Sequence, residues 1–269
     1  MSGFSADWLA LREPYDLRAR DPQVLDAVAA HLEGRASIRI VDLACGTGST
    51  LRAVSPRLPA RQRWTLTDHD PELLARVAST PTAEDIAVTV IALDLDRDLE
   101  AALEGTVDLV TTSALLDLVS DRWLQRLAEA LAARAIPFYA ALSYDGQVGF
   151  TPSDPFDGAI IDAVNQHQRT DKGFGPALGP EAADAALACF EALGYSVMAG
   201  LSGWIMGPQD RDMQAELVDG WASAARDIGT LSDKDITAWS IRRRAMIAAG
   251  QSSCRVGHVD CFAVPSATR

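Results

Sequence analysis

The sequence of 269 residues is poor in basic side chains, with 24 lysines and arginines against 37 aspartates and glutamates. The resulting formal net charge of −13 repels phosphate backbones and anionic lipid surfaces. We therefore expect neither a nucleic acid nor a membrane as a partner.

Cysteine and targeting signals are also scarce. The four cysteines, at positions 45, 189, 254 and 261, form no CxxC pair and have no histidine at zinc-ligand spacing, so we expect no metal site. Scattered thiols are typical of proteins in a reducing compartment. The first residues lack the basic start and unbroken apolar run of a signal peptide. Together these features predict a cytoplasmic protein.

Strand and helix patterns alternate over most of the chain. Short apolar runs predict strands at residues 38–43, 64–67, 88–93, 107–112, 136–143, 195–201 and 256–264. Helical spacing and capping signals predict helices at residues 21–34, 49–58, 70–77, 121–133, 180–193, 209–227 and 233–249. This order is typical of a doubly wound α/β fold, in which helices cover both faces of a mostly parallel sheet.

The chemistry is concentrated after the first predicted strand. That strand ends at Asp42, and Gly46 and Gly48 follow in a turn that opens a helix, which lets backbone N–H groups approach a ligand closely. The second predicted strand ends at Asp68, at the position where a carboxylate accepts hydrogen bonds from a ribose. A nucleotide-like cofactor is therefore expected at this edge of the sheet.

A dinucleotide oxidoreductase is the first alternative. The third glycine of the dinucleotide fingerprint would fall at Leu51, and no Tyr-x-x-x-Lys pair occurs in the chain. Both features disfavour NAD(P) as the cofactor, so the oxidoreductase is kept only as an alternative.

The segment Val41-Asp-Leu-Ala-Cys-Gly-Thr-Gly48 resembles the cofactor motif of the class I S-adenosylmethionine-dependent methyltransferases. Ala44 departs from that motif, because it stands where the first glycine is common, but both glycines nearest the ligand are present. The resemblance covers most of residues 38–143. It implies S-adenosylmethionine as cofactor and a seven-stranded Rossmann-like sheet whose last strand runs antiparallel between its neighbours.

The resemblance also implies roles for individual residues. Asp68 corresponds to the acid on the cofactor ribose, and Asp42 suits the cationic amino-acid portion of the cofactor. The strand-four motif ends under the methionine moiety, and the leading segment with Arg12, Tyr15 and Asp16 is expected to fold over the cofactor as a lid. The candidate cofactor-binding residues are Asp42, Ala44, Gly46, Gly48, Asp68, His69, Asp94, Leu95, Ser113 and Arg12.

Residues 144–180 interrupt the alternation with glycines, prolines and basic side chains, so we expect an insertion that binds the methyl acceptor. Arg169 and Lys172 would hold an anionic group, and His167 is the candidate base. The candidate acceptor-binding residues are Asp117, Tyr144, Arg169 and Lys172. By contrast, we expect His258 and Trp204 to be packing residues of the core, with a wall of the acceptor pocket as the alternative role for Trp204.

The expected organisation is a single methyltransferase domain over residues 1–269. It divides into a helical lid (1–34), a cofactor-binding core (35–143), an acceptor-binding insertion (144–180) and a C-terminal completion of the sheet (181–269). The expected activity is methylation of a small polar or anionic metabolite. A non-catalytic S-adenosylmethionine-binding protein remains the second alternative, beside the NAD(P)-dependent oxidoreductase.

Overall fold

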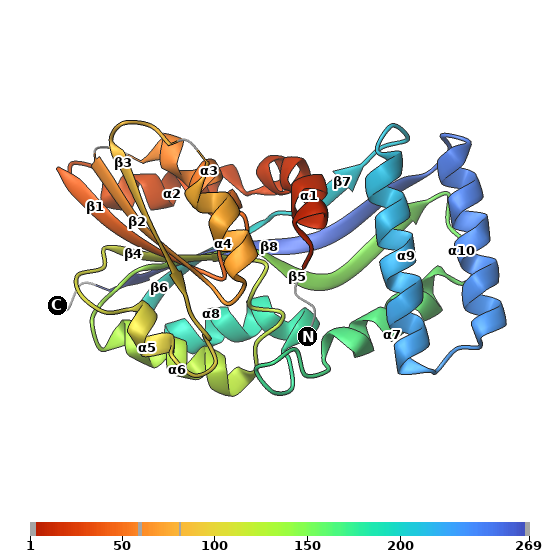
Figure 1. Ribbon diagram of the computed structural model, residues 1–269. Helices are drawn as coiled ribbons and strands as arrows, with labels where there is room; N and C mark the ends of the chain where they lie inside the picture. The colour runs from red at the N-terminus through yellow and green to blue at the C-terminus, as the bar shows by residue number, and fades with distance from the viewer. Residues whose placement is uncertain (1–3, 59–60, 81, 267–269) are drawn as a thin grey trace.

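The computed structural model describes residues 4–58, 61–80 and 82–266. A mixed sheet runs through the molecule with the strand order β3-β2-β1-β4-β5-β8-β6, and β7 pairs with the outer part of β8 (Figure 1). The strands are β1 (Ser37–Leu43), β2 (Arg61–Asp68), β3 (Ile86–Ala92), β4 (Leu109–Ser113), β5 (Phe138–Thr151), β6 (Tyr195–Leu201), β7 (Trp204–Met206) and β8 (Ser253–Pro265).

The doubly wound α/β prediction is confirmed, and so is the antiparallel last strand. Strands β1 to β5 pair in parallel, whereas β8 lies between β5 and β6 and is antiparallel to both. The described part of the chain has one strand more than the expected seven, because the short strand β7 adds to the outer half of β8.

Helices cover the two faces of the sheet. On one face lie α2 (Pro22–Leu32), α3 (Ser49–Val54) and α4 (Pro71–Ala78), which bury apolar residues against Trp64 and Phe262. On the other face lie α5 (Leu99–Ala102), α6 (Asp121–Ala132) and α8 (Ala182–Ala192), packed against Phe138 and Ala140. The apolar stripes read from the sequence explain this layering, since each helix turns its stripe to the sheet.

The cover is incomplete at the β3 edge. Helix α5 has only four residues, and Ala87, Thr89 and Ile91 of β3 are exposed on alternate positions. The expectation that helices cover both faces therefore holds at the centre of the sheet and fails at this edge.

Strand β5 is longer than predicted. It was expected to end at Ser143 but continues to Thr151, so the insertion at residues 144–180 begins as sheet. The sequence Asp145-Gly146-Gln147, which resembles a turn, forms an irregularity in the pairing with β8 instead. The long β5 and β8 form a ribbon that leaves the main sheet.

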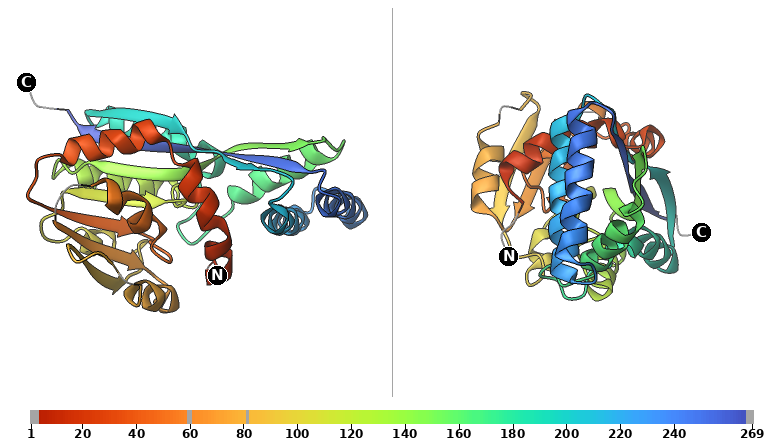
Figure 2. Two further views of the ribbon diagram at one scale, coloured as in Figure 1. Left: turned by 90° about the horizontal axis from the view of Figure 1, so that it is seen from above. Right: turned by 90° about the vertical axis from the view of Figure 1, so that its right-hand side faces the viewer.

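Three helices pack beside this ribbon: α7 (Asp157–Gln168), α9 (Arg211–Ile228) and α10 (Asp233–Ala248). We call them the helical extension, and Figure 2 shows it projecting from one side of the sheet. It has its own apolar cluster, which includes Ile160, Val218 and Trp239. At its centre the fully buried Arg243 donates to Asp157, which also accepts from the Trp239 indole at 2.9 Å.

The remaining helix, α1 (Ala6–Ala19), lies near the point where the main sheet passes into the ribbon (Figure 1). Its N-cap Ser5 accepts from the backbone N–H of Trp8 at 3.1 Å. Contacts of α1 reach both β7 and α3, so this helix bridges the ribbon and the glycine turn.

Candidate functional site

The glycine turn between β1 and α3 has a backbone that few residues adopt. Ala44, Gly46 and Gly48 have φ angles of 52°, 54° and 83°, all in the left-handed region. A side chain at Gly46 would also meet Leu9 of α1 at 3.2 Å. Two glycines are therefore required here, while Ala44 holds a left-handed conformation that costs about 1 kcal/mol for an L-residue.

Asp68 fixes this turn from the end of β2. One carboxylate oxygen accepts from the backbone N–H of Gly46 at 2.8 Å, and the other accepts from the N–H of Asp70 at 3.0 Å. The side chain is almost fully buried. The acid expected at the end of the second strand therefore holds the expected glycine turn in place by a direct hydrogen bond.

Asp42 lies beneath the turn and is fully buried. Its Oδ1 accepts from the Thr111 hydroxyl at 2.8 Å, whereas its Oδ2 has no hydrogen-bond partner in the described part of the chain. Burial raises the pKa of Asp42 to about 7, and the nearby carboxylate of Asp68 adds to the rise. Hydrogen bonding from Thr111 and the charge of Arg20 act in the opposite direction.

The residues expected around the adenine lie at the neighbouring strand ends. The backbone N–H of Leu93 donates to the Asp68 carbonyl at 2.9 Å, which places the end of β3 beside that of β2. Leu95 is buried, and its carbonyl accepts from the Trp123 indole. His69 and Asp94 are exposed, with 68% and 53% of their side-chain surface accessible.

Helix α1 lies against the glycine turn, where Leu9 is next to Gly46, and contacts α3. Arg52 of α3 donates to the carbonyl of Thr47 at 2.6 Å and to Glu13 of α1 at 2.7 Å. Arg12 faces inward rather than toward the turn, pairs with Asp16 at 3.0 Å and lies over the Trp204 ring at 5.1 Å.

Arg20, just after α1, is a site residue that the sequence analysis missed. It is 5% exposed and donates to the Ser113 hydroxyl at the end of β4 and to the Tyr139 hydroxyl, each at 3.2 Å. The available signal was the spacing of Arg12, Asp16 and Arg20, which places three charged residues on one face of a helix.

Of two expected acceptor residues, Asp117 lies four residues beyond the end of β4 and Tyr144 lies within β5. Burial raises the pKa of Asp117 to about 6, while backbone hydrogen bonds from Asp117 and Tyr144 and the charges of Arg12 and Lys172 act against this rise. Within the described residues, Asp117 Oδ1 has no hydrogen-bond partner. The Tyr144 hydroxyl donates to Asn165 at 2.8 Å.

The three basic residues of the insertion separate into two groups. Lys172 and His167 are half-buried and lie 3.3 Å apart, with Asp227 of α9 at 3.7 Å from the imidazole. Burial and the charge of Lys172 lower the pKa of His167. Arg169 is exposed and forms an ion pair with Glu181, so the structure does not bring its guanidinium to the other two.

His258 and Trp204 pack as expected, but they pack beside this polar group. The two rings lie 4.6 Å apart, and the Trp204 indole donates to Asp16 at 2.9 Å. Burial lowers the pKa of His258 to about 3, and Arg12 contributes in the same direction. In contrast to a satisfied core histidine, its Nδ1 has no partner among the residues that the structure describes.

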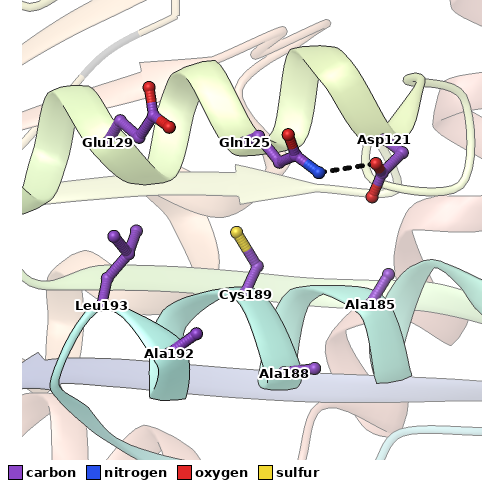
Figure 3. A pocket seen from close by; sticks show the side chains of 8 residues that line it. All are labelled: Asp121, Gln125, Glu129, Ala185, Ala188, Cys189, Ala192 and Leu193. Atoms are coloured by element: carbon purple, nitrogen blue, oxygen red, sulfur yellow. Dashed lines mark hydrogen bonds between the residues drawn. The ribbon is translucent and has the colours of Figure 1, made fainter.

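A surface groove between α6 and α8 shares no residue with this site (Figure 3). Asp121, Gln125 and Glu129 line one side, and Cys189 lies opposite them on α8. Burial and the nearby carboxylates of Asp121 and Glu129 raise the pKa of the Cys189 thiol, which keeps it protonated and unreactive.

All four cysteines are free, and no group of ligands in the described ranges could hold a metal ion. None of the helices in those ranges is long and apolar enough to cross a bilayer.

A family model and several solved structures are similar to this chain. Residues 40–135 match the family model of a methyltransferase domain, whereas no curated protein sequence matches the chain. The fold is similar to that of a cyclopropane-fatty-acyl-phospholipid synthase-like protein from Lactobacillus casei, at 15% identity and a TM-score of 0.56 over 97% of this chain and 94% of that one. It is also similar to the YcgJ protein from Bacillus subtilis, at 16% identity and a TM-score of 0.50 over 92% and 100% of the two chains.

At this identity the solved structures support the fold alone. The match of residues 40–135 spans β1 to α6 and therefore includes the glycine turn, Asp68 and the end of β4. Residues 40–135 therefore match a methyltransferase domain, and the described chain has the mostly parallel sheet with an antiparallel last strand that the resemblance implies.

Proposed function

We propose that this protein transfers a methyl group from S-adenosylmethionine to a small polar or anionic molecule. The observation that carries the proposal is the joint placement of the glycine turn, Asp42 and Asp68 at the carboxyl ends of β1 and β2. Ligands of open α/β sheets bind at this edge.

The residues at this edge suit the proposed cofactor. Asp68 would accept from the ribose, with Ala44, Gly46 and Gly48 exposing the turn backbone, and His69, Asp94 and Leu95 would border the adenine. Asp42 has a buried oxygen without a partner in the described chain, which suits the ammonium of an amino acid and not a pyrophosphate. Ser113 completes the proposed set from β4, whereas Arg12, which pairs with Asp16 and lies over the Trp204 ring, is left out of it. When bound, the cofactor supplies a methyl group on a sulfonium centre.

The acceptor side rests on the insertion at residues 144–180. Lys172 and His167 lie together and half-buried, and the charge of Lys172 acts on Asp117 at the end of β4. We therefore assign an anionic group of the acceptor to Lys172, and His167 to assist deprotonation. Arg169 would join them only if it left Glu181. A half-buried pair of polar side chains fits a small molecule better than a folded protein.

Calorimetry with S-adenosylhomocysteine, the demethylated product, tests the cofactor. We expect the Asp68→Ala variant to bind at least about tenfold more weakly, because charge-assisted hydrogen bonds contribute roughly 1.5–3 kcal/mol each. Asp85→Ala is the matched control, since Asp85 is an exposed acid at the opposite edge of the sheet and should leave the affinity unchanged.

Equal affinity of Asp68→Ala and the parent chain would remove the ribose assignment. Tight binding of NADH, with none of S-adenosylhomocysteine, would instead support the oxidoreductase alternative. Transfer of labelled methyl from S-adenosylmethionine to a panel of small metabolites separates an enzyme from a non-catalytic cofactor-binding protein. We expect transfer to members that carry a carboxylate or phosphate.

A further inference from the structure

Helix α1 turns charged residues toward the sheet. Arg12, Asp16 and Arg20 are each less than 9% exposed, although a helix on a protein surface normally buries an apolar stripe. Asp16 pairs with Arg12 and also accepts a hydrogen bond from the Trp204 indole, so both charged side chains have partners. We call Arg12, Asp16, Asp117, Trp204 and His258 the α1 polar cluster.

Two members of the cluster are not satisfied. In the described part of the chain, Asp117 Oδ1 and His258 Nδ1 are buried without a hydrogen-bond partner. Both residues are 6% exposed, and the charge of Arg12 acts on both. Folded proteins rarely leave such atoms unpaired, so each of these two atoms needs a partner that the described chain does not supply.

Tyr144 connects the two unpaired groups. It is the register partner of His258 across β5 and β8, with 6.1 Å between the rings, and its backbone N–H lies close enough to the Asp117 carboxylate to lower the pKa of that group. Asp117 and His258 are therefore neighbours on two sides of one residue. Asp117 also lies four residues beyond Ser113, at the strand end where the proposed function places the methyl donor.

The atom types define what would bind. A carboxylate oxygen only accepts, so its partner must carry an O–H or N–H group. A neutral imidazole nitrogen donates or accepts, depending on the tautomer. The Trp204 ring beside His258 adds an apolar wall.

We propose that the methyl acceptor binds at the α1 polar cluster, with a hydroxyl or amine donating to Asp117 Oδ1 and a second polar group bonded to His258 Nδ1. This inference rests on the proposed function and assigns the acceptor to hydroxyl- or amine-bearing molecules. Because Asp117 and His258 are each only 6% exposed, the side chains around them must move for the acceptor to enter. Lys172, whose charge acts on Asp117, would then hold the anionic end of the same molecule.

Three variants of the full chain test the inference. Asp117→Asn removes the buried charge, and His258→Phe removes the ring nitrogen Nδ1 that lacks a partner, so the ligand-free melting temperature should stay equal or rise. Asp260→Asn is the matched control, because this buried carboxylate accepts from the N–H groups of Leu142 and Asp21 and from the Tyr139 hydroxyl. It should melt about 2–4 °C or more below the parent chain.

The second readout is ligand binding. All three proteins should bind S-adenosylhomocysteine within about threefold of the parent, by calorimetry. With that ligand present, a pool of small alcohols, phenols and amines should raise the parent melting temperature, and Asp117→Asn should lose this shift. The same skeletons with every O–H and N–H methylated should give no shift.

The outcomes separate two failures. If Asp117→Asn and His258→Phe melt as low as Asp260→Asn, both residues are structural and the inference is wrong, while the proposed function stands. An equal shift from the methylated pool, or a shift retained by Asp117→Asn, would also overturn the inference. If the parent chain fails to bind S-adenosylhomocysteine, the proposed function itself is wrong.

Discussion

At the scale of single residues, Asp42 makes the stability of the protein depend on pH. Burial raises its pKa from 3.8 to about 7, so the folded protein holds a proton there more tightly than the unfolded chain does. The contribution of Asp42 to the free energy of unfolding is therefore greatest below about pH 4. It is lost progressively as the pH rises through the folded-state pKa of about 7.

Asp42→Asn should remove this dependence. The variant keeps an oxygen for the Thr111 hydroxyl, so it should match the parent near pH 4 and exceed it by about 2–4 kcal/mol at pH 8. Urea unfolding at several pH values, followed by tryptophan fluorescence without cofactor, measures the difference. Asp26→Asn, at an exposed acid of α2, should show no such trend. A difference between Asp42→Asn and the parent that is constant across the pH range would contradict the prediction.

At the scale of elements, α1 and the glycine turn are coupled through Glu13 and Arg52. Glu13→Gln removes one charge of this partly exposed pair, which should weaken binding of S-adenosylhomocysteine about three- to tenfold in calorimetry. Amide hydrogen exchange in α1 should become faster in the same variant. Glu33→Gln, at an exposed acid that follows α2, is the control and should change neither quantity. Unchanged exchange and affinity in Glu13→Gln would show that α1 closes independently of this pair.

The helical extension depends on a buried ion pair. Asp157→Ala leaves the fully buried Arg243 without its carboxylate and should lower the free energy of unfolding by about 3–5 kcal/mol. The exposed pair of Arg244 and Asp219 provides the comparison, and Asp219→Ala should lower the free energy of unfolding by less than about 1 kcal/mol. Urea titration measures both. Similar losses in the two variants would mean that the buried pair is not the stronger stabiliser.

The elements also show how far the sequence could be read. Strands with continuous apolar runs and helices with clear caps, such as α2 and α6, fall within a few residues of their predicted positions. The motif around Gly46 and Asp68 could also be predicted from the sequence, because it depends only on one turn and one strand end. The extension of β5 to Thr151 was missed because its support comes from β8, more than a hundred residues later.

The surroundings of the proposed acceptor residues could not be predicted from the sequence for the same reason. The partners of Arg12 and His258 come from α1, β7 and β8, and no spacing rule connects these segments. Arg20 was missed because a charged residue at the end of a helix is normally solvated, and only the tertiary fold places it against Ser113 and Tyr139. The candidate roles of Lys172 and His167 remain predictions for the binding experiments.

At the scale of the whole molecule, the net charge of −13 makes a direct prediction. The chain should bind a 20-base-pair DNA duplex or a 20-nucleotide RNA no more tightly than about 10⁻⁴ M at physiological salt. Fluorescence anisotropy with labelled oligonucleotides measures this. A micromolar affinity that falls steeply with added salt would reveal a basic surface and would widen the range of acceptors to nucleic acids.

The position of β8 has a consequence for synthesis of the protein. This strand lies between β5 and β6, yet it is made after both, so a nascent chain carries two unpaired strand edges until residue 265 has left the ribosome. Such edges are templates for pairing between chains. The cofactor half, in contrast, has all of its strands by residue 113 and gains its neighbour β5 by residue 151. The strands of the cofactor site are therefore synthesised early, and the junction with the helical extension is completed last. Stalled or prematurely terminated chains should be the species most prone to aggregate.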